Sequence, residues 1–296
     1  MKLSKLTTII IVTINGKVLK KVIKNLSNFY KIIIVENNND QQIKKEFSNK
    51  SKSIEVIVSK KNLGFAGGNN LALKKVKTPF VLILNPDVDI NKNNIQKLEY
   101  QSKKNKNFSI LAPNSNHFIQ TVNTQLDKIK KYNFIEIDKK KEITEIPWVP
   151  GWCMFCKMKD LKQMKYFDDN FFLFFEELDL CKRLKSKNKK FYLMNSNKIV
   201  HYFHGTSSNL KEINSINHSK LRLWHYHWSS FYYHRKHYGY INSLLVHISK
   251  YLRYTLKKYF SILLGNKKNY ILHNSQTRGL LSQMLNKKSF FRVKLR

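Results

Sequence analysis

The sequence predicts an α/β fold with a largely parallel sheet, followed by a helical appendage at the C-terminal end. Apolar runs rich in β-branched residues alternate with amphipathic stretches through the N-terminal half. These runs are continuously apolar, which is typical of parallel strands covered by helices on both faces. After about residue 215 the pattern changes, and aromatic residues, leucines and cations recur at helical spacing.

The first 90 residues alternate between strand and helix patterns. The expected strands are residues 7–14, 31–40, 54–59 and 79–90. The expected helices are a stretch from Val18 to Leu26, residues 41–47, and residues 71–76 behind a glycine-rich turn at 62–70. This order implies right-handed crossovers between parallel strands.

The pattern weakens in the middle of the chain and then resumes. Residues 114–147 are polar and lysine-rich, so we expect a variable excursion there. Strands are expected in "WVPGWCMFCKM" and at 190–194, and two or three amphipathic helices after residue 215. The predicted domains are residues 1–212 and residues 213–296.

Composition favours a globular protein that meets anionic partners. Hydrophobic residues make up 42% of the chain, which is ample for a core. The formal net charge of +36 suits nucleotides, anionic lipid head groups or nucleic acid. Compositional drift is the alternative explanation, because the lysines are spread over the whole length. No membrane-spanning helix or signal peptide is predicted.

The three cysteines do not form a disulfide framework. Cys153 and Cys156 lie in a predicted strand, where residues three apart point to opposite faces. That geometry suits neither a redox pair nor a zinc site. We therefore expect buried, reduced thiols in a cytoplasmic protein.

Polar residues follow each of the four predicted parallel strands, at the sheet edge where ligands bind in such folds. Asp87 and Asp89 follow the fourth strand and suit a hard divalent cation, although an ordinary acidic turn has the same composition. His201, after a later strand, could complete a metal site or be structural. The glycines before residue 71 offer backbone N–H groups to an anion or simply form a tight turn.

Glu176 and Glu177 stand at a predicted helix start, next to the aromatic run "NFFLFF". Desolvation raises the pKa of a carboxyl group and a helix N-terminus lowers it, so the balance can leave a usable general base. The alternative is ordinary helix-start electrostatics, together with an i,i+4 ion pair between Asp179 and Arg183.

Seven stretches occurring in order resemble the family 2 glycosyltransferases, specifically their rhamnosyltransferase-like branch. They are "IIIVTINGK", "IIIVENNND", "NLGFAGGNNLAL", "VLILNPDVDI", "WVPGWCMF", "FDDNFFLFFEELDLCKRL" and "IVHYFHGTSS", and they span about residues 5–210. The resemblance implies a GT-A fold and inverting transfer of a sugar from a nucleotide-diphosphate donor.

The resemblance also implies roles for individual residues. Residues expected to hold the nucleotide base and ribose are Thr13, Asn15 and Glu36. Residues expected to line the donor pocket are Asn62, Gly67, Asn70 and Asn85. Mg²⁺ or Mn²⁺ is the implied cofactor, with Asp87, Asp89 and His201 as candidate ligands. Glu177 is the implied general base, with Glu176 as its neighbour.

Some positions depart from the family pattern. Glu36 and Glu177 each stand where Asp is more usual. Pro150 and Trp152 flank Gly151 where smaller residues are usual, on the side expected to face the acceptor.

The expected function is transfer of a sugar, with rhamnose as a candidate, to a saccharide or lipid-linked acceptor in cell-surface glycan synthesis. Two alternatives stay open: a basic nucleic-acid-binding protein, and a glycosyltransferase relic that binds donor without turnover. We favour the enzyme, without nucleic acid as a partner, because the ordered acids at the strand ends are otherwise unexplained.

Residues 221–264, which include Trp224, Trp228 and Phe231, predict either a peripheral attachment to anionic lipid or a cap packed on the catalytic domain. With attachment, the protein would lie on the inner face of the cell membrane. No stretch of this region is long and apolar enough to span it.

Overall fold

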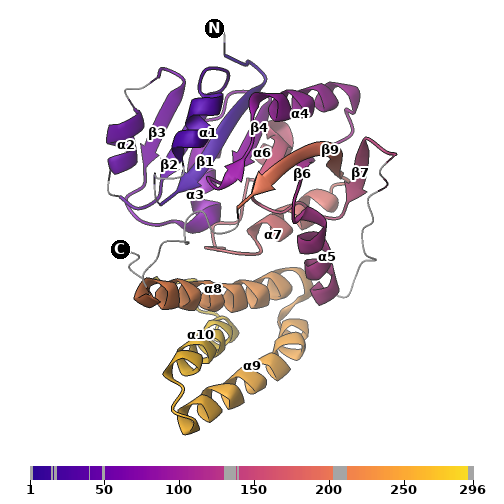
Figure 1. The fold of residues 1–296 in the computed structure, drawn as a ribbon. Helices are drawn as coiled ribbons and strands as arrows, with labels where there is room; N and C mark the ends of the chain where they lie inside the picture. The colour runs from indigo at the N-terminus through magenta and orange to yellow at the C-terminus, as the bar shows by residue number, and fades with distance from the viewer. Residues whose placement is uncertain are drawn as a thin grey trace. The chain divides into compact units, whose positions relative to one another are not determined.

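The computed structural model describes residues 3–14, 16, 19–39, 41–48, 51–129, 138, 140–202 and 212–292. These form two compact units, one of Met1–Asp168 with Glu177–Thr206 and one of Asp169–Glu176 with Ser207–Arg296 (Figure 1). The short segment 169–176 therefore belongs to the second unit, although it lies inside the first of the two domains expected from the sequence.

Four parallel strands build one half of the sheet in the first unit. They are β1 (Thr7–Thr13), β2 (Lys31–Glu36), β3 (Ile54–Val58) and β4 (Phe80–Leu84), in the spatial order β3-β2-β1-β4. Their β-branched side chains are buried, with Ile9 and Ile33 fully enclosed. The four predicted strands are thus confirmed, with β4 ending before the acidic residues.

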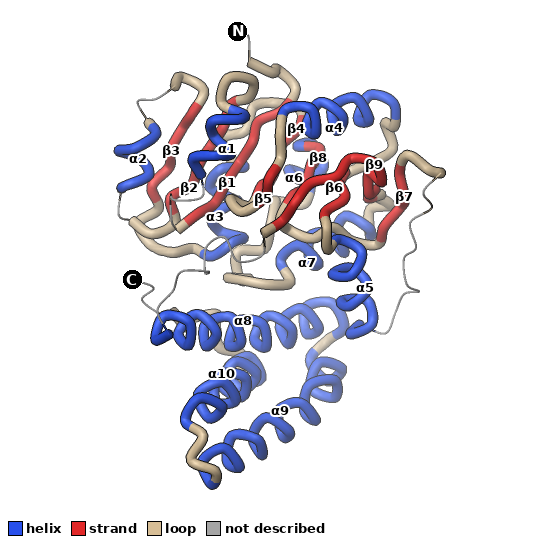
Figure 2. The backbone as a smooth tube through the Cα atoms, in the orientation of Figure 1, coloured by secondary structure: helices blue, strands red, loops and turns tan. Residues whose placement is uncertain are grey.

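Mixed pairing builds the other half of the sheet (Figure 2). The strand β8 (Cys153–Lys157) runs antiparallel to β4 and to β6 (Ile110–Ser115). The long β9 (Phe191–His201) is parallel to β6 and antiparallel to β5 (Val88–Asp89) and β7 (Ile143–Ile146). The free, buried cysteines of β8 agree with the expectation of reduced thiols.

Seven helices of the first unit are described. They are α1 (Leu19–Leu26), α2 (Gln42–Phe47), α3 (Gly64–Leu73), α4 (Lys92–Lys104), α5 (Phe118–Ile129), α6 (Met158–Gln163) and α7 (Glu176–Lys185).

The glycine-rich segment is the first correction, because α3 starts at Gly64 and the predicted turn at 62–70 is largely helical. Close packing explains glycines inside a helix. A Cβ atom at Gly68 would lie 2.6 Å from Val12 Cγ1, so glycine is needed for α3 to approach β1. Asn69 is accommodated because its side-chain amide donates to the Phe65 carbonyl one turn earlier.

The predicted excursion at 114–147 is the second correction, because it contains α5 and β7. Phe118 and Val122 are buried, and Ile146 joins the core from β7. Few positions of this lysine-rich stretch are apolar, so its hydrophobic periodicity is weak.

The second unit carries three long helices, in agreement with the two or three predicted. They are α8 (Glu212–Tyr238), α9 (Tyr240–Leu263) and α10 (Lys267–Met284). A Cβ atom at Gly279 of α10 would lie 2.3 Å from the Trp224 carbonyl oxygen, so glycine permits close packing with α8. Within the described ranges, no helix has the length and hydropathy needed to cross a membrane.

Candidate active site

The ends of β1 and β2 lie side by side because Thr13 pairs with Glu36 in the parallel register. Glu36 is fully buried, and its Oε2 atom accepts a hydrogen bond from the Lys44 backbone N–H of α2 at 3.2 Å. Its Oε1 atom is also buried and has no hydrogen-bond partner among the described residues. A buried acceptor without a donor suits a ligand N–H or O–H group. Asn15 lies outside the described residues.

Asn37 fixes the loop after β3, a role that sequence analysis did not assign. Its Oδ1 atom accepts from the Leu63 N–H at 3.0 Å, and its amide donates to the Gly64 carbonyl at 2.9 Å. Asn62 completes this arrangement, because its Oδ1 atom accepts from the Gly64 N–H and from the Asn37 amide. The Asn62 side chain thus shapes the loop, while its expected contact with the donor stays a prediction.

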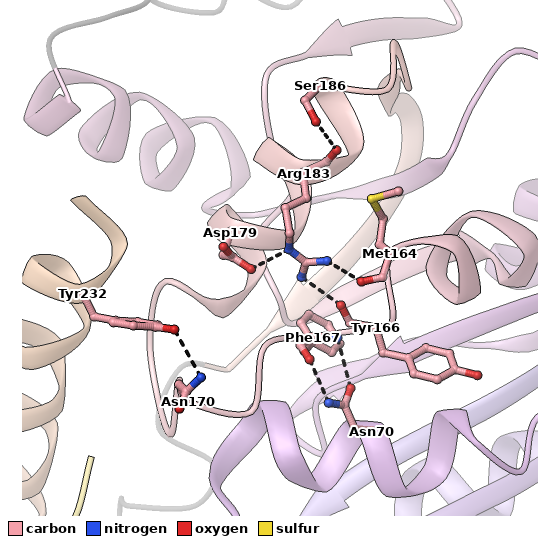
Figure 3. Close-up of polar contacts among 9 residues, drawn as sticks. All are labelled: Asn70, Met164, Tyr166, Phe167, Asn170, Asp179, Arg183, Ser186 and Tyr232. Atoms are coloured by element: carbon pink, nitrogen blue, oxygen red, sulfur yellow. Dashed lines mark hydrogen bonds and ion pairs between the residues drawn. The ribbon is translucent and has the colours of Figure 1, made fainter. Parts of the chain in front are cut away.

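Asn70 holds the backbone of Phe167, far along the chain (Figure 3). Its amide donates to the Phe167 carbonyl at 2.9 Å, and its Oδ1 atom accepts from the Phe167 N–H at 3.1 Å. One turn earlier in α3, a Cβ atom at Gly67 would lie 2.9 Å from Leu63 Cβ. Asn70 and Gly67, both predicted to line the donor pocket, therefore also contribute to the packing of the first unit.

The structure brings together two of the three predicted metal ligands, Asp87 and His201. Antiparallel pairing of β5 with β9 sets Val88 opposite His201, and the Asp87 Oδ1 atom lies 3.4 Å from His201 Nε2. Their side chains are only 10% and 6% exposed. The ring of Trp152 stacks on His201 at 4.8 Å, and the Trp152 carbonyl accepts from the Asn85 N–H.

Asp89 has different partners from Asp87. Its Oδ2 atom lies 2.6 Å from Lys21 Nζ and accepts from the Tyr202 hydroxyl at 3.4 Å. The hydrogen bond to Asp89 raises the pKa of the Lys21 ammonium group. An ion-paired carboxylate is a poorer candidate ligand than Asp87, whose partner is an imidazole.

One carboxylate and one imidazole can hold a divalent cation only if other ligands complete its shell. No cluster of three metal-ligating side chains occurs in the part of the chain that the structure describes. Mg²⁺ sites commonly use one or two carboxylates together with substrate phosphates and water. The Asp87–His201 pair fits a cation of that kind, shared with a bound diphosphate.

Glu176 and Glu177 form the first turn of α7. The Oε2 atom of Glu177 is buried and has no hydrogen-bond partner in the described ranges, although the residue as a whole keeps some exposure. Burial raises the pKa of Glu177 to about 7, and its own backbone N–H opposes that rise. A carboxyl group poised near neutral pH can take a proton from a substrate.

Asp179 has the structural role that sequence analysis kept as an alternative. Its Oδ2 atom accepts from Arg183 Nε at 2.8 Å, which confirms the expected i,i+4 pair. The two terminal nitrogens of Arg183 donate to the carbonyls of Met164 and Tyr166 (Figure 3). Arg183 and Asn70 therefore hold neighbouring parts of the same loop. Local sequence patterns do not predict these contacts, because the residues that make them are distant in the sequence.

The sequence of the first unit matches a known family. Residues 8–164 match the model for glycosyl transferase family 2, which is 157 of the 296 residues. The chain belongs to glycosyl transferase family 2. The family expected from the seven sequence stretches is thereby confirmed.

Two curated relatives are each 25% identical to this family member. One is the low-salt glycan biosynthesis hexosyltransferase Agl10 of Haloferax volcanii, aligned over 57% of this chain and 58% of that protein. The other is the rhamnosyltransferase WbbL of Escherichia coli K12, aligned over 63% of this chain and 79% of that protein. The alignment thus leaves out a large part of the archaeal relative.

Solved structures show the fold. The mannosyltransferase PcManGT from Pyrobaculum calidifontis, in complex with GDP-Man and Mn²⁺, superimposes with a TM-score of 0.57 at 10% identity, covering 95% of this chain and 88% of that one. TarS 1–349 from S. aureus, in complex with UDP, gives a TM-score of 0.51 at 15% identity, covering 98% and 94%. The predicted GT-A fold with a C-terminal helical region is confirmed.

Proposed function

We propose that this family 2 member transfers a sugar from a nucleotide-diphosphate donor to an acceptor hydroxyl with inversion. The observation that carries the proposal is Glu177, a carboxyl group with a pKa raised to about 7 by burial, at the start of α7. Desolvation makes such a carboxylate a stronger base than one in water, and the Oε2 atom of Glu177 has no hydrogen-bond partner among the described residues.

Glu177 takes the proton of the acceptor hydroxyl as that oxygen bonds to the anomeric carbon. The bond from the anomeric carbon to the donor phosphate oxygen breaks on the opposite face, so the configuration inverts and a nucleotide diphosphate leaves. Proton transfer to a positioned base typically contributes about 10²–10⁴-fold to the rate. Glu176, its buried neighbour, completes the proposed pair.

The donor would bind along the ends of β1 to β4. The unpartnered Oε1 atom of Glu36 supports a contact to the nucleotide base or ribose. Asp87 and His201 would hold Mg²⁺ or Mn²⁺ together with the diphosphate. When bound, such a cation supplies charge stabilisation for the departing diphosphate.

We propose rhamnose as the candidate sugar, and a saccharide or lipid-linked acceptor in cell-surface glycan synthesis. The two relatives, one named a rhamnosyltransferase and one a hexosyltransferase of glycan biosynthesis, support this choice. A panel of dTDP-, UDP- and GDP-sugars, followed by release of the nucleotide diphosphate, tests it directly.

Peripheral attachment to anionic lipid is part of the proposal, and α9 supports it. Seven of the exposed apolar side chains form a stripe along this helix, at intervals of three or four residues: Ile241, Leu245, Ile248, Leu252, Leu256, Tyr259 and Leu263. Arg253, Lys257 and Lys258 lie among them in the sequence. An apolar stripe accompanied by cations suits the interface of an anionic bilayer.

The variant Glu177→Gln tests the base. We expect turnover to fall by about 10² or more while the affinity for the nucleotide diphosphate is unchanged, because only the proton acceptor is lost. Glu55→Gln, which alters a surface carboxylate paired with Lys31 and Lys75, is the control. Unchanged turnover in Glu177→Gln would remove Glu177 as the base.

The variant Asp87→Ala tests the metal site. Calorimetric titration with a nucleotide diphosphate, with and without Mn²⁺, should show that the metal-dependent part of the affinity is lost. Asp89→Ala, which removes the partner of Lys21, should retain it. An unchanged metal effect in Asp87→Ala would exclude that carboxylate.

A further inference from the structure

Residues 169–176, which we name the aromatic strap, lead directly into α7 and the proposed base. The strap belongs to the second unit, and Phe171, Phe172 and Phe175 in it are buried. Phe174 and Phe175 both have left-handed backbone conformations, with φ of 70° and 68°. Aromatic residues rarely adopt this conformation, so the surroundings must hold it in place.

One face of α8 contacts the strap along its length. The ring of Tyr232 lies 4.9 Å from that of Phe171, and the ring of His225 stacks on Phe172 at 4.5 Å. The ring of Tyr226 lies within 5.6 Å of those of Phe174 and Phe175. The contacting residues of α8 follow the periodicity of one helix face: Arg222, His225, Tyr226, Ser229, Tyr232, Tyr233 and Lys236.

A hydrogen bond fixes the strap backbone at the centre of this face. The hydroxyl of Ser229, which is fully buried, donates to the Leu173 carbonyl at 2.9 Å. Leu173 directly precedes the two left-handed phenylalanines. Without the hydroxyl this carbonyl would lose its partner on α8, and the bend into α7 would lose its polar anchor.

We propose that α8 positions the catalytic pair by holding the aromatic strap, with Ser229 as the main positioning residue. This inference rests on the proposed role of Glu177. The strap and α8 belong to the same unit, and the strap continues along the chain into the first turn of α7.

The test is a double-mutant cycle of Ser229→Ala with Glu177→Gln. Turnover is measured as nucleotide-diphosphate release from the best sugar donor of the panel. We expect Ser229→Ala to lower kcat about tenfold, the scale of one lost buried hydrogen bond, with little change in the KM for donor. In the Glu177→Gln background the same change should have almost no further effect, because the two residues act through one group.

Ser243→Ala is the matched control, since the Ser243 hydroxyl is also buried in this unit and donates to a carbonyl, that of Phe231, at 2.9 Å. The Ser243→Ala variant should have a melting temperature similar to that of Ser229→Ala, but its kcat should be unchanged. An equal loss of kcat in both serine variants, or a full tenfold further loss in the Glu177→Gln background, would overturn the proposal. Full turnover of Glu177→Gln alone would instead overturn the proposed function.

Tyr232→Phe keeps the inference testable if Ser229→Ala does not fold. It removes only the hydroxyl that accepts from the Asn170 amide at 3.2 Å and keeps the ring against Phe171. We expect a smaller fall in kcat, about two- to threefold for an exposed hydrogen bond. Tyr240→Phe, whose hydroxyl donates to the Met284 carbonyl, is its control, and equal values for the two variants would contradict the positioning role.

Discussion

The helices α8 and α9 contain similar kinds of residues but bury different ones: α8 buries large aromatic side chains, whereas α9 buries polar side chains. Both mix aromatic residues, leucines and cations at helical spacing. In α8 the large side chains of Trp224, Trp228 and Phe231 are almost fully buried. In α9 the buried side chains are those of Ser243, His247 and Ser261, whereas the apolar stripe is exposed.

Hydrogen bonds explain why α9 can bury its polar side. Ser243 donates to the Phe231 carbonyl, and the His247 ring bonds to the Ser230 hydroxyl at 2.9 Å and to the Ser243 carbonyl at 2.8 Å. Buried polar groups that are fully paired carry little penalty. Periodicity therefore identifies a helix, but the partners of its polar residues decide which side faces inward.

The same contrast bears on the interpretation of residues 221–264. The expectation of a membrane-facing position is wrong for three residues that form the core of the helical unit, namely Trp224, Trp228 and Phe231. Leu245, Leu252, Leu256 and Leu263 are all more than half exposed and remain available. One helix thus packs within the unit, and the next carries the surface that we propose for lipid.

The largest effect should come from truncating one large apolar side chain in each helix and comparing the two losses in the free energy of unfolding. Trp228→Ala should lower the free energy of unfolding by about 3–5 kcal/mol, the usual range for a buried Trp. It also removes the indole N–H that donates to the Lys287 carbonyl at 3.0 Å. Leu256→Ala, at a side chain with 71% exposure, should change it by less than about 0.5 kcal/mol. Urea unfolding measures both, and similar losses would refute the difference in packing.

Acid should weaken both helices, because each contains a buried histidine whose pKa is lowered. Burial lowers the pKa of His225 in α8 and of His247 in α9 to about 3. Between about pH 6.5 and 3 the unfolded chain binds these protons and the folded chain does not. The free energy of unfolding should therefore decrease as the pH is lowered, by up to about 1.4 kcal/mol per pH unit for each histidine.

The variant His247→Gln separates this effect from general acid denaturation. Its urea midpoint should fall less steeply than that of the parent between pH 7 and 4, because one of the two histidines whose folded-state pKa is lowered to about 3 is gone. An identical slope would show that His247 is not buried as a neutral group.

The sequence predicted the parallel half-sheet well because each strand there is a continuous apolar run, and the residues at its ends follow from the topology. Asp87 and His201 were expected together and lie together. The helical state of residues 64–70 was missed, because glycine and asparagine are poor helix formers and only the packing of Gly68 against Val12 explains a glycine there.

Contacts between distant residues were beyond reach for a different reason. The bonds of Asn70 to Phe167 and of Ser229 to Leu173 join residues 97 and 56 positions apart. No periodicity encodes such a pairing. The sequence places the aromatic run directly before the acids, and the structure adds that α8 contacts that run.

Membrane attachment sharpens the comparison of the helices further. The double variant Leu252→Glu/Leu256→Glu should lose binding to anionic liposomes by about 10²-fold or more, since burial of each leucine contributes about 1.5–3 kcal/mol. Asn242→Glu/Ser249→Glu, at exposed positions of α9 that carry no apolar side chain, is the charge-matched control. Flotation measures both, and equal binding of the two variants would exclude the stripe.

The cations of α9 should contribute least. Lys257→Ala should weaken binding to liposomes with anionic lipid by about fivefold, since a cation near such a surface contributes about 1 kcal/mol. Lys187→Ala, at an exposed residue that follows α7, changes the net charge equally and should have no effect. Salt screens this attraction within about 10 Å at 0.1 M, so the difference between the two variants should shrink as salt rises. Equal weakening by both variants would mean that the overall charge of +36, and not α9, draws the protein to lipid.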